Sequence, residues 1–305
     1  MVITVFDVRT CMPVIFDKLG VDYLAISPNG KALVGKAWRC DLGIFDLETL
    51  QLQHAVVGDR MGIQGLTFTS DSLRVIDVRV HQTNVWEPSV LVSQGSESDN
   101  RELGDSEEHA GVEPPSPLQH ESNRISVLHC YGKHSIAFCG RNNGAVDICH
   151  LDDPVNTMRE LYRHPRRNQY PGAYAGVTCI HSKSEPSMVV TSDDNGFFRV
   201  MQVTTGAMGE WAAELPMEGR VERSRLITQV IIHPSGSLVL VSSIETDYLW
   251  SVTRKEKIAE ITGRRRQFCN WIHREPSQLV LLEDNDVTFF NWEYLTQRGT
   301  RESLL

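Results

Sequence analysis

Three stretches of this chain repeat one pattern: Tyr23-Leu-Ala-Ile-Ser-Pro-Asn-Gly30, Gly65-Leu-Thr-Phe-Thr-Ser-Asp-Ser72 and Gln229-Val-Ile-Ile-His-Pro-Ser-Gly236. Each begins with an alternating apolar run, which is typical of a β-strand, and ends in residues that favour a tight turn. A second apolar run follows each turn at once. The pattern therefore predicts a series of β-hairpins rather than helices.

A third run follows each hairpin and ends on an aromatic residue beside an acidic or polar one, as in 44–47, 85–87 and 249–252. Repeats of about 40–50 residues with such an ending are the signature of WD-type propeller blades. We therefore predict an all-β fold, a WD-repeat-type β-propeller with six full blades and a partial closing blade, of the seven-bladed type.

The repeats divide the chain into successive strands. We expect the first, second and third strands of the six repeats at 23–27, 32–37 and 43–47; 65–69, 74–80 and 83–86; 125–130, 135–139 and 145–149; 177–181, 188–191 and 197–203; 228–232, 238–242 and 248–252; 270–273, 278–282 and 287–292. Strands at 3–8 and 13–16 form the partial blade, and 3–8 is expected to pair with the chain end near 294–300. A blade without its first two strands has an open edge, so we expect self-association, and we expect the chain to be the tail of a longer protein.

The charge is unevenly distributed. The net charge is −9, and residues 92–123 hold eight acids against Arg101, so this segment supplies most of the excess. It is poor in apolar residues and cannot offset its ordering entropy, so we predict a disordered acidic insertion at 93–123 within a single domain, 1–305. A further strand is expected just before it, at 89–92.

The seven cysteines are odd in number and have no Cys-x-x-Cys spacing, which indicates free thiols in a reducing, cytoplasmic location. The sequence has no apolar run long enough for a membrane span, so no membrane contact is expected. Cys130, Cys139 and Cys149 fall on three strands of one blade beside His129 and His150. They could ligate zinc, or their small thiols could simply fill a tight core; we predict no metal and no cofactor.

The stretch 72–92, Ser-Leu-Arg-Val-Ile-Asp-Val-Arg-Val-His-Gln-Thr-Asn-Val-Trp-Glu-Pro-Ser-Val-Leu-Val, resembles the C-terminal WD-repeat region of fungal NACHT-type, NLR-like (STAND) proteins. An acidic Ser/Pro-rich break often follows this stretch in that family, as it does here. The resemblance implies the ligand-sensing or scaffold part of a signalling ATPase. The chain lacks a Gly-x-x-x-x-Gly-Lys-Ser/Thr loop, so it lacks the ATPase part.

A WD-type blade is stabilised by an Asp in the turn between its second and third strands, a Trp in the third strand and a His before the first. We assign this structural role to Trp86, Asp194, Trp250 and Trp292. Where Phe replaces Trp, the indole hydrogen bond is lost.

Basic residues gather between repeats, in connections expected to open on one face of a propeller. They are Arg163, Arg166, Arg167, Arg220, Arg223, Arg264, Arg265 and Arg266, and the aromatic Tyr170 lies near the first three. Guanidinium groups beside an aromatic ring suit phosphate, acidic peptide or RNA, although charged loops can also simply be solvated.

The sequence contains no nucleophile elbow and no His-Glu-x-x-His motif, so we predict that the protein is not an enzyme. We predict a protein-interaction module that binds other proteins or peptides. The alternative is an RNA- or ribosome-associated propeller that binds anions through the arginine-rich face.

Overall fold

A computed structural model describes most of the chain. The described residues are 3–7, 12–17, 21–37, 40–56, 63–69, 71–79, 83–87, 124–131, 136–151, 158–165, 175–184, 187–205, 210–221, 226–244, 246–262, 266–272, 278–283 and 286–291. The predicted strand at 89–92, the insertion at 93–123 and the expected pairing segment at 294–300 lie outside them.

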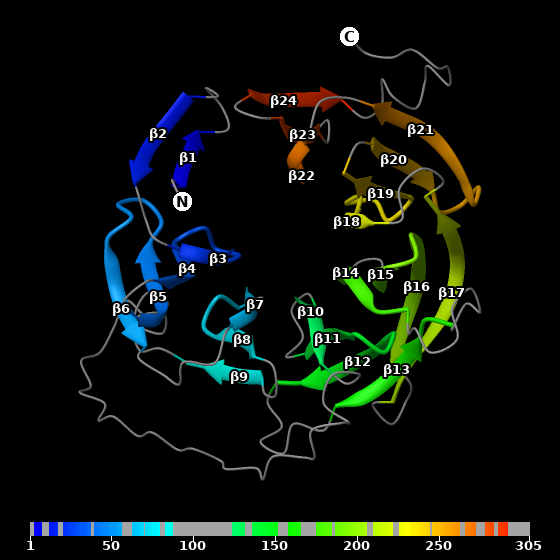
Figure 1. Ribbon diagram of the computed structural model, residues 1–305, viewed down its shortest axis with the longest axis horizontal. Coiled ribbons are helices and arrows are strands. Elements are labelled where there is room, and N and C mark those ends of the chain that lie inside the picture. The colour runs from blue at the N-terminus through cyan, green and yellow to red at the C-terminus, as the bar shows by residue number, and fades with distance from the viewer. Residues whose placement is uncertain are drawn as a thin grey trace. The chain divides into compact units, whose positions relative to one another are not determined.

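All regular structure in these ranges is antiparallel β-sheet, which confirms the predicted all-β class. The described residues form four sheets of four strands, two of three and one of two, and in each the strands follow chain order (Figure 1). In chain order the sheets are β1 (Ile3–Asp7) with β2 (Met12–Asp17); β3 (Val21–Ile26), β4 (Ala32–Ala37), β5 (Cys40–Asp46) and β6 (Leu52–Val56); β7 (Ile63–Phe68), β8 (Val75–Arg79) and β9 (Thr83–Trp86); β10 (Ile125–Cys130), β11 (Ile136–Arg141), β12 (Ala145–His150) and β13 (Arg159–Arg163); β14 (Val177–Ser184), β15 (Ser187–Asp193), β16 (Phe197–Thr205) and β17 (Trp211–Arg220); β18 (Ile227–Ile232), β19 (Leu238–Ser243), β20 (Thr246–Ser251) and β21 (Glu256–Thr262); β22 (Arg266–Ile272), β23 (Gln278–Glu283) and β24 (Asp286–Asn291).

The chain divides into two compact units, 1–135 and 136–305. The core of the first unit contains Ala32, Val34, Ile44 and Phe68, from β4, β5 and β7. The second unit has one core around the strands β15, β16, β18 and β19, and a further cluster around β19 and β20. In both units, apolar residues of one sheet pack against those of the next.

The repeated turn that marks the sequence has one geometry in the structure. The amides of Gly30, Ser72 and Gly236 donate to the carbonyls of Ser27, Thr69 and His233, at 2.8, 2.9 and 2.8 Å. The donor residue has positive φ in every case, 70°, 66° and 74°, which favours glycine. These turns fix the hairpins β3–β4, β7–β8 and β18–β19.

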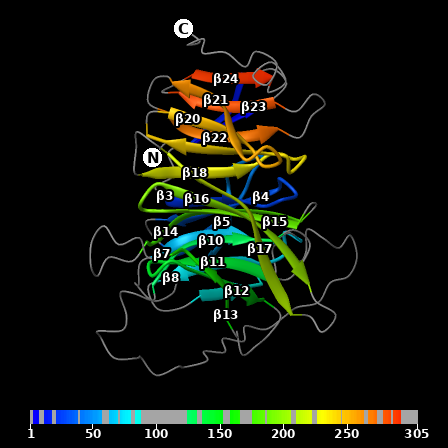
Figure 2. The same cartoon turned by 90° about the vertical axis from the view of Figure 1, so that its right-hand side faces the viewer.

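The predicted first, second and third strands are all present, with ends shifted by up to four residues. Four sheets also have the fourth strand that we expect of a full blade and for which the sequence predicts no bounds, namely β6, β13, β17 and β21. Figure 2 shows the longest of these, β17, running beside β16. Its side chains are mostly exposed or half-buried, as expected of an outermost strand.

No helix in the part of the chain that the structure describes is long and apolar enough to span a membrane.

Candidate functional site

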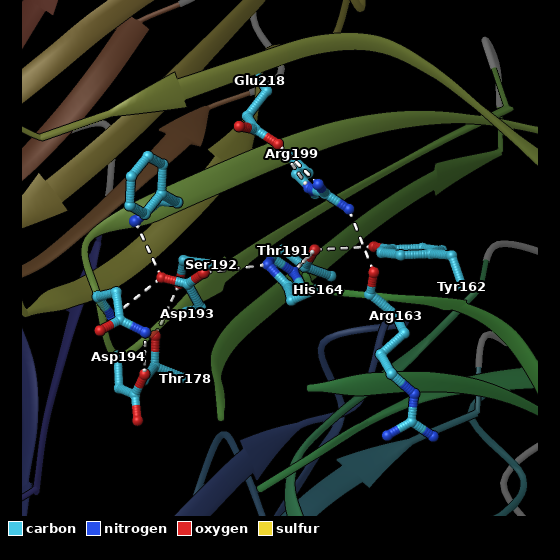
Figure 3. Close-up of polar contacts among 12 residues, drawn as sticks. Tyr162, Arg163, His164, Thr178, Thr191, Ser192, Asp193, Asp194, Arg199 and Glu218 are labelled. Atoms are coloured by element: carbon cyan, nitrogen blue, oxygen red, sulfur yellow. Dashed lines mark hydrogen bonds and ion pairs between the residues drawn. The ribbon is translucent and has the colours of Figure 1, made fainter. Parts of the chain in front are cut away.

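A buried polar network links β13 to β15 in the second unit (Figure 3). His164, which follows β13, places its Nε2 atom 2.8 Å from the Thr191 hydroxyl and its Nδ1 atom 3.3 Å from Oδ2 of Asp193. The Tyr162 hydroxyl lies 2.8 Å from the same Thr191 oxygen. Burial raises the pKa of the Tyr162 phenol, so this hydroxyl keeps its proton. The network connects two neighbouring sheets through neutral and charged groups.

The other carboxylate oxygen of Asp193 shapes the turn that follows β15. Its Oδ1 atom accepts hydrogen bonds from the amides of Asn195 and Phe197, at 2.9 and 3.0 Å. Asp193 thus makes the contacts within the turn, whereas the side chain of Asp194, to which we assigned the structural role, is exposed and accepts from the Asn195 side chain and the Gly176 amide. In an Asp-x-x-Gly turn, the side chain of the first Asp accepts a hydrogen bond from the backbone amide of the second residue after it. The sequence Asp193-Asp-Asn-Gly196 has this pattern, and it would have identified Asp193.

A second network, in the sheet β7–β9, contains an arginine instead of a histidine. Arg79 and Asp77 are buried on β8, and the Arg79 Nη2 atom donates to the Asp77 carboxylate at 3.2 Å. The Trp86 indole on β9 donates to the same carboxylate at 3.0 Å. Trp86 thus makes a hydrogen bond of the kind expected for its structural role. The sequence analysis overlooked its two charged partners.

The tryptophan of the sheet β18–β21 behaves differently. Trp250 packs edge-on against Phe198 of the preceding sheet, with ring centroids 5.1 Å apart, and its indole Nε1 has no hydrogen-bond partner. It contributes by packing alone. Trp292 lies outside the described residues. In the sheet β10–β13, the charged pair is Arg141 and Asp147, which are hydrogen-bonded.

The predicted cysteine positions on β10, β11 and β12 are confirmed, and Cys130, Cys139, Cys149 and Cys179 are not joined in disulfides. Burial raises the pKa of Cys179, which keeps it protonated. No group of three or more His, Cys, Asp or Glu side chains in the described ranges is arranged to hold a metal ion.

The structure describes the side chains of two residues of the predicted basic face. Arg163 ends β13 and donates from Nε to Glu160 at 3.0 Å and from Nη1 to the Asn143 carbonyl at 3.1 Å. Arg220 ends β17, and its guanidinium lies 4.9 Å from the centre of the Phe197 ring. Only the backbone of Arg266 is described, and Arg166, Arg167, Tyr170, Arg223, Arg264 and Arg265 lie outside the described residues.

Exposed apolar side chains accompany these arginines. Leu226 precedes β18 and Ile244 follows β19, and they flank the paired residues Ile227 and Ser243 at one end of that sheet. Arg220 lies at the corresponding end of the preceding sheet, where it pairs with Phe197. We call Arg163, Arg220, Leu226 and Ile244 the turn-end surface, since all lie at sheet ends where second strands turn into third strands.

Solved structures show which fold these sheets belong to, and 1344 of their chains are similar to this one. One is the crystal structure of the β-propeller domain of Cps50 (Swd1) from Myceliophteria thermophila, with a TM-score of 0.70 and 12% sequence identity, covering 95% of this chain and 90% of that one. The fold is a β-propeller. At such low identity the similarity establishes the fold and not the function.

No family model matches the chain, and no curated protein matches it.

Proposed function

We propose that residues 1–305 form one WD-type propeller that acts as a non-catalytic protein-interaction module. The observation that supports this most is the composition of the turn-end surface, where exposed Leu226 and Ile244 lie at the same sheet ends as Arg220. Arginine and exposed apolar side chains together are typical of protein interfaces, in which a few such residues provide most of the binding energy.

The buried networks fit the same function. Hydrogen bonds join neighbouring strands in these networks, from Trp86 to Asp77 and between Thr191 and both Tyr162 and His164, and this makes the sheets rigid. A rigid sheet holds its end residues in fixed positions, which lowers the entropy lost when a partner binds.

The finer proposal is that the module is the ligand-sensing or scaffold part of a fungal, cytoplasmic NLR-like signalling protein. Its support is the sequence of 72–92, within which Val75–Arg79 and Thr83–Trp86 form the second and third strands of one sheet. Sequencing the genomic DNA immediately upstream of the Met1 codon tests this proposal. An in-frame extension that encodes a phosphate loop is expected, and an in-frame stop codon directly upstream would contradict it.

The rival function is anion or RNA binding by the arginines. Arg163 is already bonded to Glu160, and Arg220 stacks on Phe197, so these two guanidinium groups are less available to a polyanion than free ones. This observation favours a protein partner.

Affinity capture with the 305-residue chain separates the two functions. We expect captured proteins to persist after nuclease treatment and to dissociate little between about 50 and about 200 mM salt, because contacts with nucleic acid weaken steeply over this range. The matched variants Leu226→Asp and Leu215→Asp each add one charge at an exposed leucine, and only the first lies on the turn-end surface. Loss of all binding on nuclease treatment would favour the RNA function instead.

A further inference from the structure

Three turns of the chain contain the pair Asn-Gly, at 29–30, 143–144 and 195–196. The three turns have the same backbone, because each glycine amide donates to the carbonyl three residues earlier, over 2.8, 3.0 and 3.2 Å. Each of these glycines has positive φ, of 70°, 80° and 78°. A difference in reactivity among the three pairs must therefore come from their surroundings.

An asparagine before glycine loses ammonia readily, because glycine has no side chain to hinder attack by its own nitrogen. The glycine nitrogen attacks the carboxamide carbon Cγ, the Cγ–Nδ2 bond breaks, and ammonia leaves with the proton of the glycine amide. Water then opens the resulting five-membered succinimide. Addition of water at Cγ gives aspartate, and addition at the backbone carbon gives isoaspartate, whose main chain runs through Cβ and Cγ. The reaction needs no reagent except water, but the Asn-Gly peptide must be able to rotate.

The pair 143–144 is held by neighbouring residues. The Asn143 carbonyl accepts from Nη1 of Arg163 at 3.1 Å, and the Gly144 carbonyl accepts from the amide of His164 at 2.8 Å. A Cβ atom on Gly144 would lie 2.7 Å from the carbonyl oxygen of Ala175, so the backbone here is closely packed. Both ends of the glycine unit are therefore restrained.

The pair 195–196 is held in a similar way. Gly196 is buried, and its carbonyl accepts from the amide of Val221 at 2.9 Å. The Asn195 amide donates to the Asp193 carboxylate at 2.9 Å. The carboxamide nitrogen of Asn195, which would be the leaving group, donates to the Asp194 carboxylate at 3.0 Å. These contacts oppose both rotation of the peptide and departure of ammonia.

The pair 29–30 is open. Asn29 and Gly30 are exposed, and no atom of another described residue, chain neighbours excepted, lies within 4 Å of a Cβ position on Gly30. The Asn29 Oδ1 atom accepts from the Ser27 hydroxyl at 2.7 Å and from the Lys31 amide at 3.0 Å. The second bond closes a ring that contains the Asn29–Gly30 peptide, so the carboxamide stays beside the nitrogen that attacks it. Both donors stabilise the negative charge that develops on Oδ1 during the attack.

We propose that Asn29 is a site of spontaneous deamidation, at which the folded chain forms aspartate and isoaspartate much faster than at Asn143 or Asn195. The product changes a contact between two sheets. The Asn29 amide donates to the Ser72 hydroxyl at 3.0 Å, which links this turn to the turn between β7 and β8. Isoaspartate lengthens the main chain by one carbon between this amide and Gly30 and adds a carboxylate. The modification therefore displaces the turn and weakens the link.

Tryptic peptide mapping by mass spectrometry tests the proposal, because the three pairs lie in different tryptic peptides, 19–31, 142–159 and 184–199. The 305-residue chain is incubated at one mildly alkaline pH, both folded and unfolded in guanidinium chloride. The rate in the unfolded chain corrects each site for its local sequence. We expect the ratio of folded to unfolded rate to be at least about tenfold higher for Asn29 than for Asn143 and Asn195. Equal ratios, a higher ratio at either other site, or no conversion of Asn29 in the folded chain would overturn the inference.

A matched pair of variants assigns the product to its residue. Asn29→Ser should keep the turn, because Ser235 occupies the equivalent position before β19 and its hydroxyl accepts from the Ser237 amide at 3.2 Å. Isoaspartate in the aged, folded chain is counted by methyl transfer from labelled S-adenosylmethionine, using an isoaspartyl methyltransferase. We expect Asn29→Ser to remove most of the label and Asn195→Ser to leave it unchanged. Label that persists in Asn29→Ser would contradict the assignment.

Discussion

The sheets β7–β9 and β14–β17 place opposite charges at the same position. Arg79 and Asp193 each end the second strand, and each pairs with the first residue of the first strand. Two residues earlier, the first sheet has Asp77 and the other has Thr191. All four of these side chains are buried. An aromatic side chain is hydrogen-bonded to the earlier residue of each pair, Trp86 to Asp77 and Tyr162 to Thr191. These two sheets thus hold buried polar sets of different residue types at the same position.

The strongest test of this comparison removes the acid beside the arginine. Asp77→Ala leaves the buried Arg79 guanidinium without its carboxylate, and we expect a loss of about 3–5 kcal/mol of unfolding free energy, measured by urea denaturation. The control is Glu256→Ala, which breaks the exposed Arg254–Glu256 pair and should cost less than about 1 kcal/mol. Equal effects of the two variants would show that the buried pair is not needed.

The corresponding test in the other sheet is Thr191→Val. The variant keeps the side-chain volume but removes the hydroxyl that Tyr162 and His164 share, so two buried groups lose a partner. We expect a loss of about 2–3 kcal/mol in the same assay. Val241 occupies the equivalent position on β19, which shows that the strand accepts valine there. The exposed Thr204→Val is the control, and a similar loss from it would contradict the network's role.

A smaller effect separates the two tryptophans. Trp86→Phe removes a hydrogen bond to a carboxylate, whereas Trp250→Phe removes an indole N–H that has no partner. Both variants lose the same volume, so we expect Trp86→Phe to cost about 1.5 kcal/mol more. Thermal or urea unfolding of both proteins measures the difference. A larger loss for Trp250→Phe would mean that packing on Phe198 outweighs the hydrogen bond.

The smallest effect concerns a histidine on β10. The Nδ1 atom of His164 lies 3.3 Å from Oδ2 of Asp193. For His129, burial lowers the pKa to about 4, although a backbone hydrogen bond at Cys130 opposes this shift. The unfolded chain therefore binds a proton from pH 6.5 downward while the folded chain does not, and stability falls as the pH drops from 6.5 towards 4. We expect His129→Asn to remove about 1 kcal/mol of this loss between about pH 6.5 and 5.5.

The control for this prediction is the exposed His54→Asn, measured by urea denaturation at both pH values. The His129 prediction is wrong if both variants change with pH as the wild type does.

The sequence predicts the inner strands well because they are apolar runs between turn residues. The six residues of β19, for example, are all buried, and four of them are Leu or Val. The fourth strands were given no boundaries, because side chains such as those of β13, Arg-Glu-Leu-Tyr-Arg, are only half covered and follow no simple period. The networks were missed for a different reason. A search for Trp, Asp and His cannot recognise Arg79, whose role depends on which strand residues face one another.

The order of strands also has a consequence for how the chain reaches its fold. In every described sheet, each strand pairs with its neighbour in sequence, so all pairings close short loops. Short loops cost little entropy, and contacts of low sequence separation form early. Each sheet can therefore assemble as its own hairpin series, much as a repeat array does, with cooperativity supplied by the apolar clusters between neighbours. Hydrogen exchange should accordingly be slowest in β15 and β19, the second strands whose residues are almost all buried, and fastest in β13 and β17.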